Sequence, residues 1–75
     1  MSTILDAVRA GRLDTIEELL TKGTQVDSPN DYNQTPLHIA IETGEEEITR
    51  LLIDKGANIN AIDRWGRTPL HIAVK

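Results

Sequence analysis

The sequence Thr35-Pro36-Leu37-His38-Ile39-Ala40 occurs a second time, without change, at residues 68–73. The two copies are 33 residues apart, and the same offset aligns further glycines and apolar residues along the chain. The aligned pairs are Ala7 with Ala40, Gly11 with Gly44, Leu19 with Leu52, Lys22 with Lys55, Gly23 with Gly56, and Val26 with Ile59. A fixed period of this length is typical of proteins built from stacked structural repeats. The sequence therefore predicts a repeat architecture.

Each period contains the start and end signals of two helices. Thr35 before Pro36 predicts a helix start, because the hydroxyl can accept a backbone amide proton and proline has a preset φ. Gly44 is suited to the left-handed conformation that closes a helix. A second helix is expected over residues 45–55, closed by Gly56, and its apolar side carries Ile48, Leu51 and Leu52.

Residues 57–66 have the composition of an extended, turned connection. Gly66 is expected at a position with positive φ, and the residue one period earlier is Asn33, which tolerates positive φ better than most residues. Each period thus predicts a helix, a turn, a second helix and a loop.

These motifs resemble the ankyrin repeat: T-P-L-H-I-A, then G-x-x-x-x-x-x-L-L-I-x-K-G-A-N-I-N, then D-x-x-G-x-T-P-L-H. The resemblance implies an all-α solenoid of stacked helix-turn-helix units with projecting β-hairpin loops, or fingers. It divides the chain into an N-terminal capping repeat at 2–34, a full internal repeat at 35–67 and the first helix of an incomplete third repeat at 68–75. The first helices and the fingers would line a concave face.

The first repeat is polar at three positions where the second is apolar: Asp6 aligns with Ile39, Thr15 with Ile48 and Glu18 with Leu51. Thr15 and Glu18 are three residues apart and share one face of a helix. A polar outer face is typical of a terminal repeat, so we expect an N-terminal cap. Either Ser2 or Thr3 can supply the hydroxyl that caps its first helix.

At the other end, the sequence stops at Lys75, inside the first helix of a third repeat. We expect Leu52, Ile53, Leu70 and Ile72 to lose part of the cover that a complete third repeat would give. At about 25 cal/mol per Å², the exposure of a few such side chains amounts to several kcal/mol. The chain is therefore expected either to self-associate as an oligomer through this end or to be a truncated part of a longer protein.

The composition is that of an ordinary soluble domain, with 39% hydrophobic and 27% charged residues among 75. A formal net charge of −4 disfavours nucleic acid as a partner, because phosphates attract clustered Lys and Arg. No apolar run approaches the roughly 20 residues needed to span a bilayer, so no membrane partner is expected. The absence of cysteine removes disulfides and thiolate metal sites and is compatible with a reducing compartment, so we expect a cytoplasmic location.

The histidines and acidic residues of the sequence do not form a pattern typical of a catalytic or metal site. His38 and His71 are the only histidines, and no helix carries two of them one turn apart, as metal-binding helices do. By resemblance to the ankyrin repeat, each would hydrogen-bond near its capping threonine and the adjoining loop. Consecutive glutamates at residues 45–47 point in different directions on a helix and do not form a calcium loop. We expect no enzymatic activity, no cofactor and no metal site.

Tyr32 and Trp65 align at the 33-residue offset, and both fall in the expected finger turns. One interpretation is that each ring only packs over the neighbouring finger. The other is that exposed aromatics beside charged residues anchor a partner protein. The contact positions implied by the resemblance are Asp31, Tyr32, Gln34, Glu42, Thr43, Arg64, Trp65, Arg67 and Lys75.

The expected function is therefore that of a protein-protein interaction scaffold, which binds a partner through the finger tips and the concave helix face. The alternative is an interaction arm of a larger multidomain protein whose separate activity lies beyond residue 75.

Overall fold

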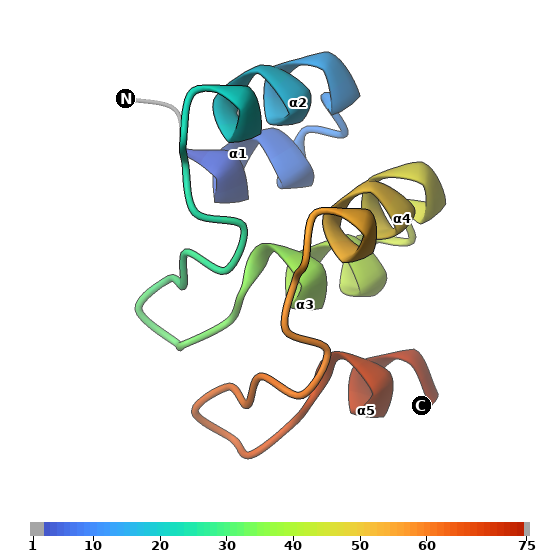
Figure 1. Cartoon of the computed structure of the whole chain (residues 1–75). Coiled ribbons are helices and arrows are strands. Elements are labelled where there is room, and N and C mark those ends of the chain that lie inside the picture. The colour runs from blue at the N-terminus through green and yellow to red at the C-terminus, as the bar shows by residue number, and fades with distance from the viewer. Residues whose placement is uncertain (1–2, 75) are drawn as a thin grey trace.

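The helices stack in successive layers along the chain. The computed structural model describes residues 3–74. Figure 1 shows α1 beside α2, α3 beside α4, and α5 below them. The helices are α1 (Ile4–Arg9), α2 (Leu13–Thr21), α3 (Pro36–Thr43), α4 (Glu46–Asp54) and α5 (Pro69–Val74). Helix α3 packs against α1 on one side and α5 on the other, so the first helix of each unit forms a continuous row.

The helix boundaries agree with the local signals of the sequence. Thr35 caps α3 by accepting the His38 amide proton at 3.4 Å, and Gly44 closes the helix at φ 76°. Thr3 caps α1: its hydroxyl accepts from the Asp6 amide at 3.3 Å, and its own amide donates to the Asp6 carboxylate at 3.2 Å. The cap is therefore Thr3, while Ser2 lies outside the described residues.

Two loops project from the same side of the helix stack in Figure 1. We define the first finger as residues 28–34 and the second finger as residues 61–67. Asn33 and Gly66 have φ values of 60° and 78°, which confirms the predicted pair of left-handed positions. Two backbone hydrogen bonds close each loop. In the first finger the Asn30 amide donates to the Gln34 carbonyl at 3.0 Å and the Asn33 amide to the Asn30 carbonyl at 2.9 Å. In the second, the Asp63 amide donates to the Arg67 carbonyl and the Gly66 amide to the Asp63 carbonyl, both at 3.0 Å.

The described residues contain no β-strand, and the two backbone bonds within each finger do not make a strand ladder. The fold is all-α, as predicted, but the β-hairpin detail of the fingers is not confirmed.

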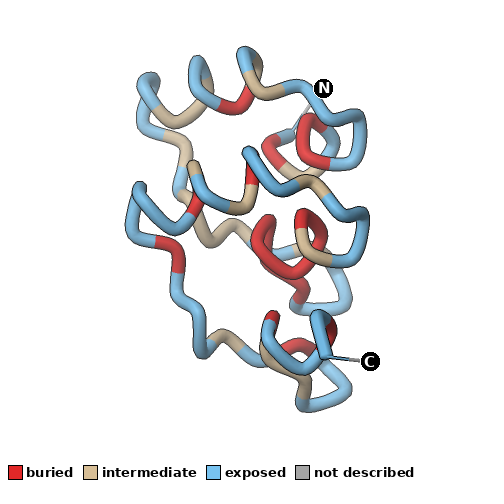
Figure 2. Tube along the Cα trace, turned by 90° about the vertical axis from the view of Figure 1, so that its right-hand side faces the viewer, coloured by how far each residue is buried: buried red, intermediate tan, exposed pale blue. Residues whose placement is uncertain are grey.

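The core is aliphatic and runs between the layers, where Figure 2 shows the buried positions gathered on the helices. Its largest fully buried members include Ile4, Val8, Ile16, Leu37, Ile39, Ile48 and Leu52. The predicted apolar side of α4 is confirmed for Ile48 and Leu52, which are buried, while Leu51 is half-buried against the same core. In the part of the chain that the structure describes, no helix has both the length and the apolar character required to cross a bilayer.

The expected loss of cover at the last layer is confirmed for two residues and wrong for two others. Leu70 is 68% exposed, whereas Leu37 at the same position of the previous copy is 1% exposed, and Ile53 is 46% exposed. Leu52 and Ile72, by contrast, are buried. Leu52 belongs to the core beneath α4, and Ile72 lies on α5, which packs against α3. In the last layer, exposure of these apolar residues is limited to the side of α4 and α5 that carries Ile53 and Leu70.

Two of the three polar positions of the first unit have local partners. Asp6 completes the cap of α1, and Glu18 forms an exposed ion pair with Lys22 at 3.4 Å. Thr15 is half-buried. The assignment of residues 2–34 as a capping repeat stays a prediction, as do the boundaries of the following units.

Candidate protein-interaction surface

Each finger is organised around one side chain that accepts two backbone amide protons. In the first finger, Asn30 Oδ1 accepts from the amides of Tyr32 and Gln34, both at 2.9 Å. In the second, Asp63 Oδ1 accepts from the amides of Trp65 at 3.0 Å and Arg67 at 2.9 Å. Asn30 and Asp63 are one period apart. The same turn is thus built twice, and each time it fixes the backbone that carries an aromatic ring.

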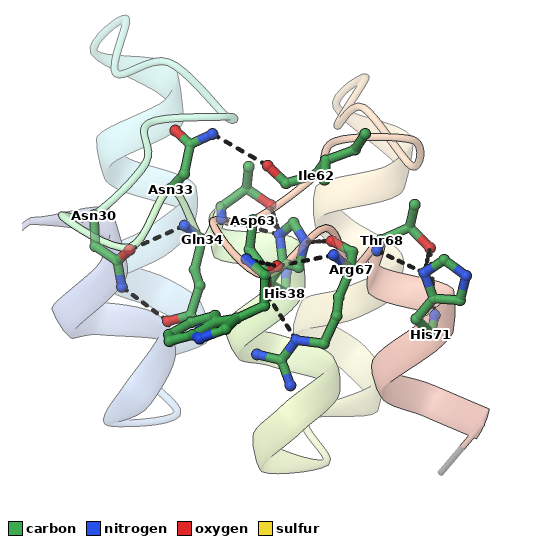
Figure 3. A network of polar contacts seen from close by, with 11 residues as sticks. Asn30, Asn33, Gln34, His38, Ile62, Asp63, Arg67, Thr68 and His71 are labelled. Atoms are coloured by element: carbon green, nitrogen blue, oxygen red, sulfur yellow. Dashed lines mark hydrogen bonds and ion pairs between the residues drawn. The ribbon is translucent and has the colours of Figure 1, made fainter.

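The other polar atom of the Asn30 or Asp63 side chain forms a hydrogen bond with the side chain of the residue four positions later, as Figure 3 shows. Asn30 Nδ2 donates to Gln34 Oε1 at 3.0 Å. Arg67 Nε donates to Asp63 Oδ2 at 2.9 Å, and this pair is also a salt bridge. A neutral amide pair in the first finger therefore corresponds to an ion pair in the second.

The Asp63 carboxylate is buried, and its hydrogen bonds decide its ionisation. Burial alone raises the pKa of Asp63, because it disfavours the charged form. Hydrogen bonds from the Arg67 amide, the Arg67 side chain and the Trp65 amide act in the opposite direction, as does the positive charge of Arg67. The net result is a pKa below the ordinary value of an aspartate. Asp63 is thus ionised in the folded chain, and its hydrogen bonds to Trp65 and Arg67 fix the turn of the second finger.

Two contacts join the second finger to the first, and a third joins it to α3. The Arg64 amide donates to the Tyr32 carbonyl at 2.9 Å, and Asn33 Nδ2 donates to the Ile62 carbonyl at 3.1 Å. His38, fully buried on α3, has Nε2 at 2.9 Å from the Arg67 carbonyl. Two hydrogen bonds thus hold the two fingers side by side.

The ring of His38 has a defined tautomer in this arrangement. The Arg67 carbonyl can only accept, so Nε2 carries the proton. Nδ1 then accepts from the Thr35 amide at 3.1 Å. These contacts agree with the role that the resemblance implied for His38. His71 repeats the contact with its own threonine, since the Thr68 amide donates to His71 Nδ1 at 3.0 Å.

The finger tips bring two aromatic rings and two guanidinium groups together. The rings of Tyr32 and Trp65 stack with centroids 5.6 Å apart and planes inclined by 25°. The Arg64 guanidinium carbon lies 5.6 Å from the Tyr32 centroid and 5.9 Å from that of Trp65. Arg67 lies 5.2 Å from the Trp65 centroid. We name these four residues, Tyr32, Arg64, Trp65 and Arg67, the tip patch.

The tip patch is packed internally and still open to solvent. Tyr32 is 47% exposed and Trp65 is 58% exposed, although they contact each other. Packing between neighbouring fingers, one of the two sequence-based interpretations, is therefore present. The exposed half of each ring is apolar surface that a further molecule could cover.

The other predicted contact residues do not all join the tip patch. Asp31 is exposed in the first finger, next to Tyr32. Glu42 and Thr43 are exposed at the C-terminal end of α3, whereas the fingers adjoin its N-terminal end. Lys75 lies outside the described residues.

Gln34 has to be removed from the predicted contact set. Its side chain is turned inward, leaving the residue 7% exposed, and its amide is bonded to Asn30. The physical reason is that Gln34 completes the turn of the first finger, as Arg67 does in the second.

Sequence reasoning did not single out Asn30 and Asp63, although they organise the fingers. The signal was present in the internal alignment, where Asn30 pairs with Asp63 and Gln34 with Arg67 at the 33-residue offset. Asx side chains that accept from amides two residues ahead are typical of turns.

A second surface feature lies at the outward side of the last layer. It is an open groove of about 290 Å³, formed between α3, α4, the following loop and α5. Its apolar lining includes Leu37, Ile41, Ile53, Ile59, Leu70 and Ala73. Within residues 3–74, no group of three or more histidine or acidic side chains is placed so that it could hold a metal ion.

Comparisons with known proteins agree with this architecture. A family model described as ankyrin repeats in three copies matches residues 4–75. The chain is also similar to the ankyrin repeat domain-containing protein oryK of Aspergillus oryzae, with 39% identity over 47 residues. That alignment covers 63% of this chain and only 8% of the fungal protein. With its repeated T-P-L-H-I-A helices, its paired fingers and a family match over nearly its full length, the chain belongs to the ankyrin-repeat family.

Proposed function

We propose that this chain is a protein-interaction scaffold without catalytic activity, and that it binds its partner through the finger tips and the concave face next to them. Ankyrin repeats are in general protein-protein interaction modules. The observation that carries the proposal is the tip patch, in which Tyr32 and Trp65 are stacked, about half exposed and flanked by two arginines. Tyrosine, tryptophan and arginine are the residue types that most often dominate binding energy at interfaces.

The geometry of the fingers favours binding because the surface is ordered before a partner arrives. Asn30 and Asp63 fix both turns, and the bond from the Arg64 amide to the Tyr32 carbonyl joins them. Each long side chain that a partner must immobilise costs about 0.5–1.5 kcal/mol, so a surface whose rings already rest on each other loses less on binding.

The test is affinity capture by the immobilised chain, with bound proteins quantified by mass spectrometry. We expect a set of proteins that bind the natural chain and are lost when both Tyr32→Ala and Trp65→Ala are introduced. Arg50→Ala, an exposed change on α4 away from the fingers, is the matched control and should retain them. Circular dichroism of all variants must show the same helix content. If the doubly substituted chain is folded and still captures the same proteins, the finger tips are not the binding surface.

A second candidate function is an interaction arm of a larger protein. The similarity to oryK supports it, because the matched region is a small part of a much longer ankyrin-containing protein. The coding sequence around this region decides the matter: an open reading frame that continues into a further domain supports the arm, and a stop codon directly after Lys75 contradicts it.

A third proposal concerns the groove at α5. We propose that a second copy of this chain covers it, so that the molecule self-associates through its last layer. The supporting observation is the contrast between Leu70, which is mostly exposed, and Leu37, which is buried at the equivalent position. An apolar patch that meets its own copy across a twofold axis forms a closed, self-complementary interface.

A further inference from the structure

We propose that the tip patch recognises an acidic segment of its partner, in which a carboxylate binds Arg64 and a neighbouring apolar or aromatic side chain rests on the exposed ring surface of Trp65. This inference rests on the proposed scaffold function and names the chemistry of the partner.

The two arginines of the tip patch differ in what they already bind. Arg67 Nε is bonded to the buried Asp63 carboxylate, so its charge is largely compensated within the finger. Within residues 3–74 the structure shows two ion pairs, and neither includes Arg64. Arg64 is therefore the cation of the tip patch that forms no ion pair within the described residues and is accessible to a carboxylate of another molecule.

The position of Arg64 prepares it for a planar anion. Its guanidinium lies within 6 Å of both ring centroids, so the rings restrict its orientation. A guanidinium presents parallel N–H donors that match the two oxygens of a carboxylate. An arginine that is already restricted loses less conformational freedom when it forms this pair.

The charges of the chain favour a short acidic segment as the ligand of the tip patch and disfavour an extended polyanion. The chain has a formal net charge of −4, and Asp31 stands in the first finger at the position that Arg64 has in the second. A nucleic acid or a long acidic tail would be repelled over most of the molecular surface. One or two carboxylates directed at the second finger avoid that repulsion, which places the acidic residue of the partner over Arg64 and away from Asp31.

The ring surface explains why the acidic residue should have an apolar neighbour. Trp65 keeps more than half of its surface in solvent, directly beside the guanidinium that would bind the carboxylate. Apolar surface contributes about 25 cal/mol per Å² when it is removed from water. Covering the ring also removes water from the neighbouring ion pair, which strengthens it.

The experiment selects short random peptides displayed on phage against the immobilised chain. We expect enrichment of peptides in which Asp or Glu lies next to an aromatic or aliphatic residue. A synthetic peptide of the enriched sequence should lose about tenfold or more in affinity with Arg64→Gln, which corresponds to one charge-assisted contact. Arg64→Lys should recover only part of the affinity, because lysine keeps the charge without the planar fork. Arg50→Gln removes the same charge elsewhere and should have no effect.

The outcomes separate this inference from the proposed function. Peptides that depend on Trp65 but carry no acidic residue, or bind equally well with Arg64→Gln, overturn the acidic partner and leave the scaffold surface intact. Peptides that bind regardless of Trp65→Ala and Tyr32→Ala overturn both. Failure to enrich any peptide counts against the acidic segment, while the capture experiment still tests the scaffold. Each variant is compared by circular dichroism, so that a loss of fold is not read as a loss of contact.

Discussion

At the residue scale, the buried pair of Asp63 and Arg67 does for the second finger what Asn30 and Gln34 do for the first. Both pairs span four residues and leave the backbone of an aromatic residue bonded to an Asx oxygen. The ion pair of Asp63 and Arg67 has the stronger side-chain bond, but it requires that a carboxylate be buried. The neutral version shows that the turn can be built without charge.

Replacing Asp63 with Asn tests this equivalence. The amide can still accept from the backbone, but its nitrogen would meet Arg67 Nε, which also only donates. We expect Asp63→Asn to lower the free energy of unfolding by about 1–3 kcal/mol. Adding Arg67→Gln recreates the pair of the first finger and should restore part of the loss. Urea unfolding of the two single variants and the double variant gives the coupling energy. A double variant that loses the sum of the single effects would show that the pairs are not equivalent.

The lowered pKa of Asp63 also predicts a pH dependence. Its unfolded value is about 3.9, and the folded value lies below it, so the folded state favours the carboxylate. The stability from this group is present above about pH 4 and is lost as the pH falls through the folded pKa. The difference in unfolding free energy between the natural chain and Asp63→Asn should therefore shrink on acidification. A difference that is unchanged or larger in acid would contradict the assigned shift.

At the scale of elements, α3 and α5 begin with the same five residues, each preceded by a threonine, but have different neighbours. Leu37 on α3 is enclosed by the core, while Leu70 on α5 faces the open groove. Both histidine rings accept at Nδ1 from the amide of their own threonine, and His38 in addition bonds to the second finger through Nε2. Because the two copies have the same sequence, the difference in burial and hydrogen bonding between them comes from the elements that surround each copy.

This contrast predicts unequal effects from equal substitutions. Leu37→Ala should reduce the free energy of unfolding by about 2–5 kcal/mol, because it leaves a cavity in the core. Leu70→Ala removes the same atoms from a mostly exposed position and should change stability by no more than about 0.5 kcal/mol in the monomer. Denaturant unfolding at low protein concentration measures both. Similar losses for the two variants would mean that the last layer is covered.

The helices could be predicted from the sequence because their signals are local. Thr35-Pro36 and Gly44 bound α3, and Gly56 follows the end of α4, wherever those helices lie in space. The burial of Gln34 could not be predicted in the same way, since it depends on how the turn of the finger folds back on Asn30. Leu52 and Ile53 are adjacent on α4, and the helical period already places Leu52 on the apolar side with Ile48; the structure buries Leu52 and leaves Ile53 exposed.

At the scale of the whole molecule, the two proposed surfaces occupy different places. The tip patch lies on the fingers, and the groove lies at the outward side of the last layer. A partner at the fingers therefore leaves the groove accessible, and a second copy at the groove leaves the tip patch accessible. Self-association and partner binding should be separable by substitution.

The self-association proposal predicts a concentration-dependent mass. Light scattering should show a shift toward twice the mass of a single chain as the concentration rises. Leu70→Asp should abolish this shift, because it places a charge in the apolar contact, and it should leave the helix content unchanged. Trp65→Ala is the control and should still associate. A monomeric mass for the natural chain at high concentration would contradict the proposal.

Binding at the tip patch can be followed by tryptophan fluorescence, because Trp65 is the only tryptophan of the chain. The most direct measurement is the fluorescence of Trp65 while a captured partner, or a peptide selected on the chain, is titrated to saturation. If the finger tips bind the partner, the exposed indole becomes covered. Its emission should shift to shorter wavelength, and its quenching by acrylamide should decrease. Saturable binding, confirmed by calorimetry, that leaves the emission and quenching of Trp65 unchanged would contradict the account.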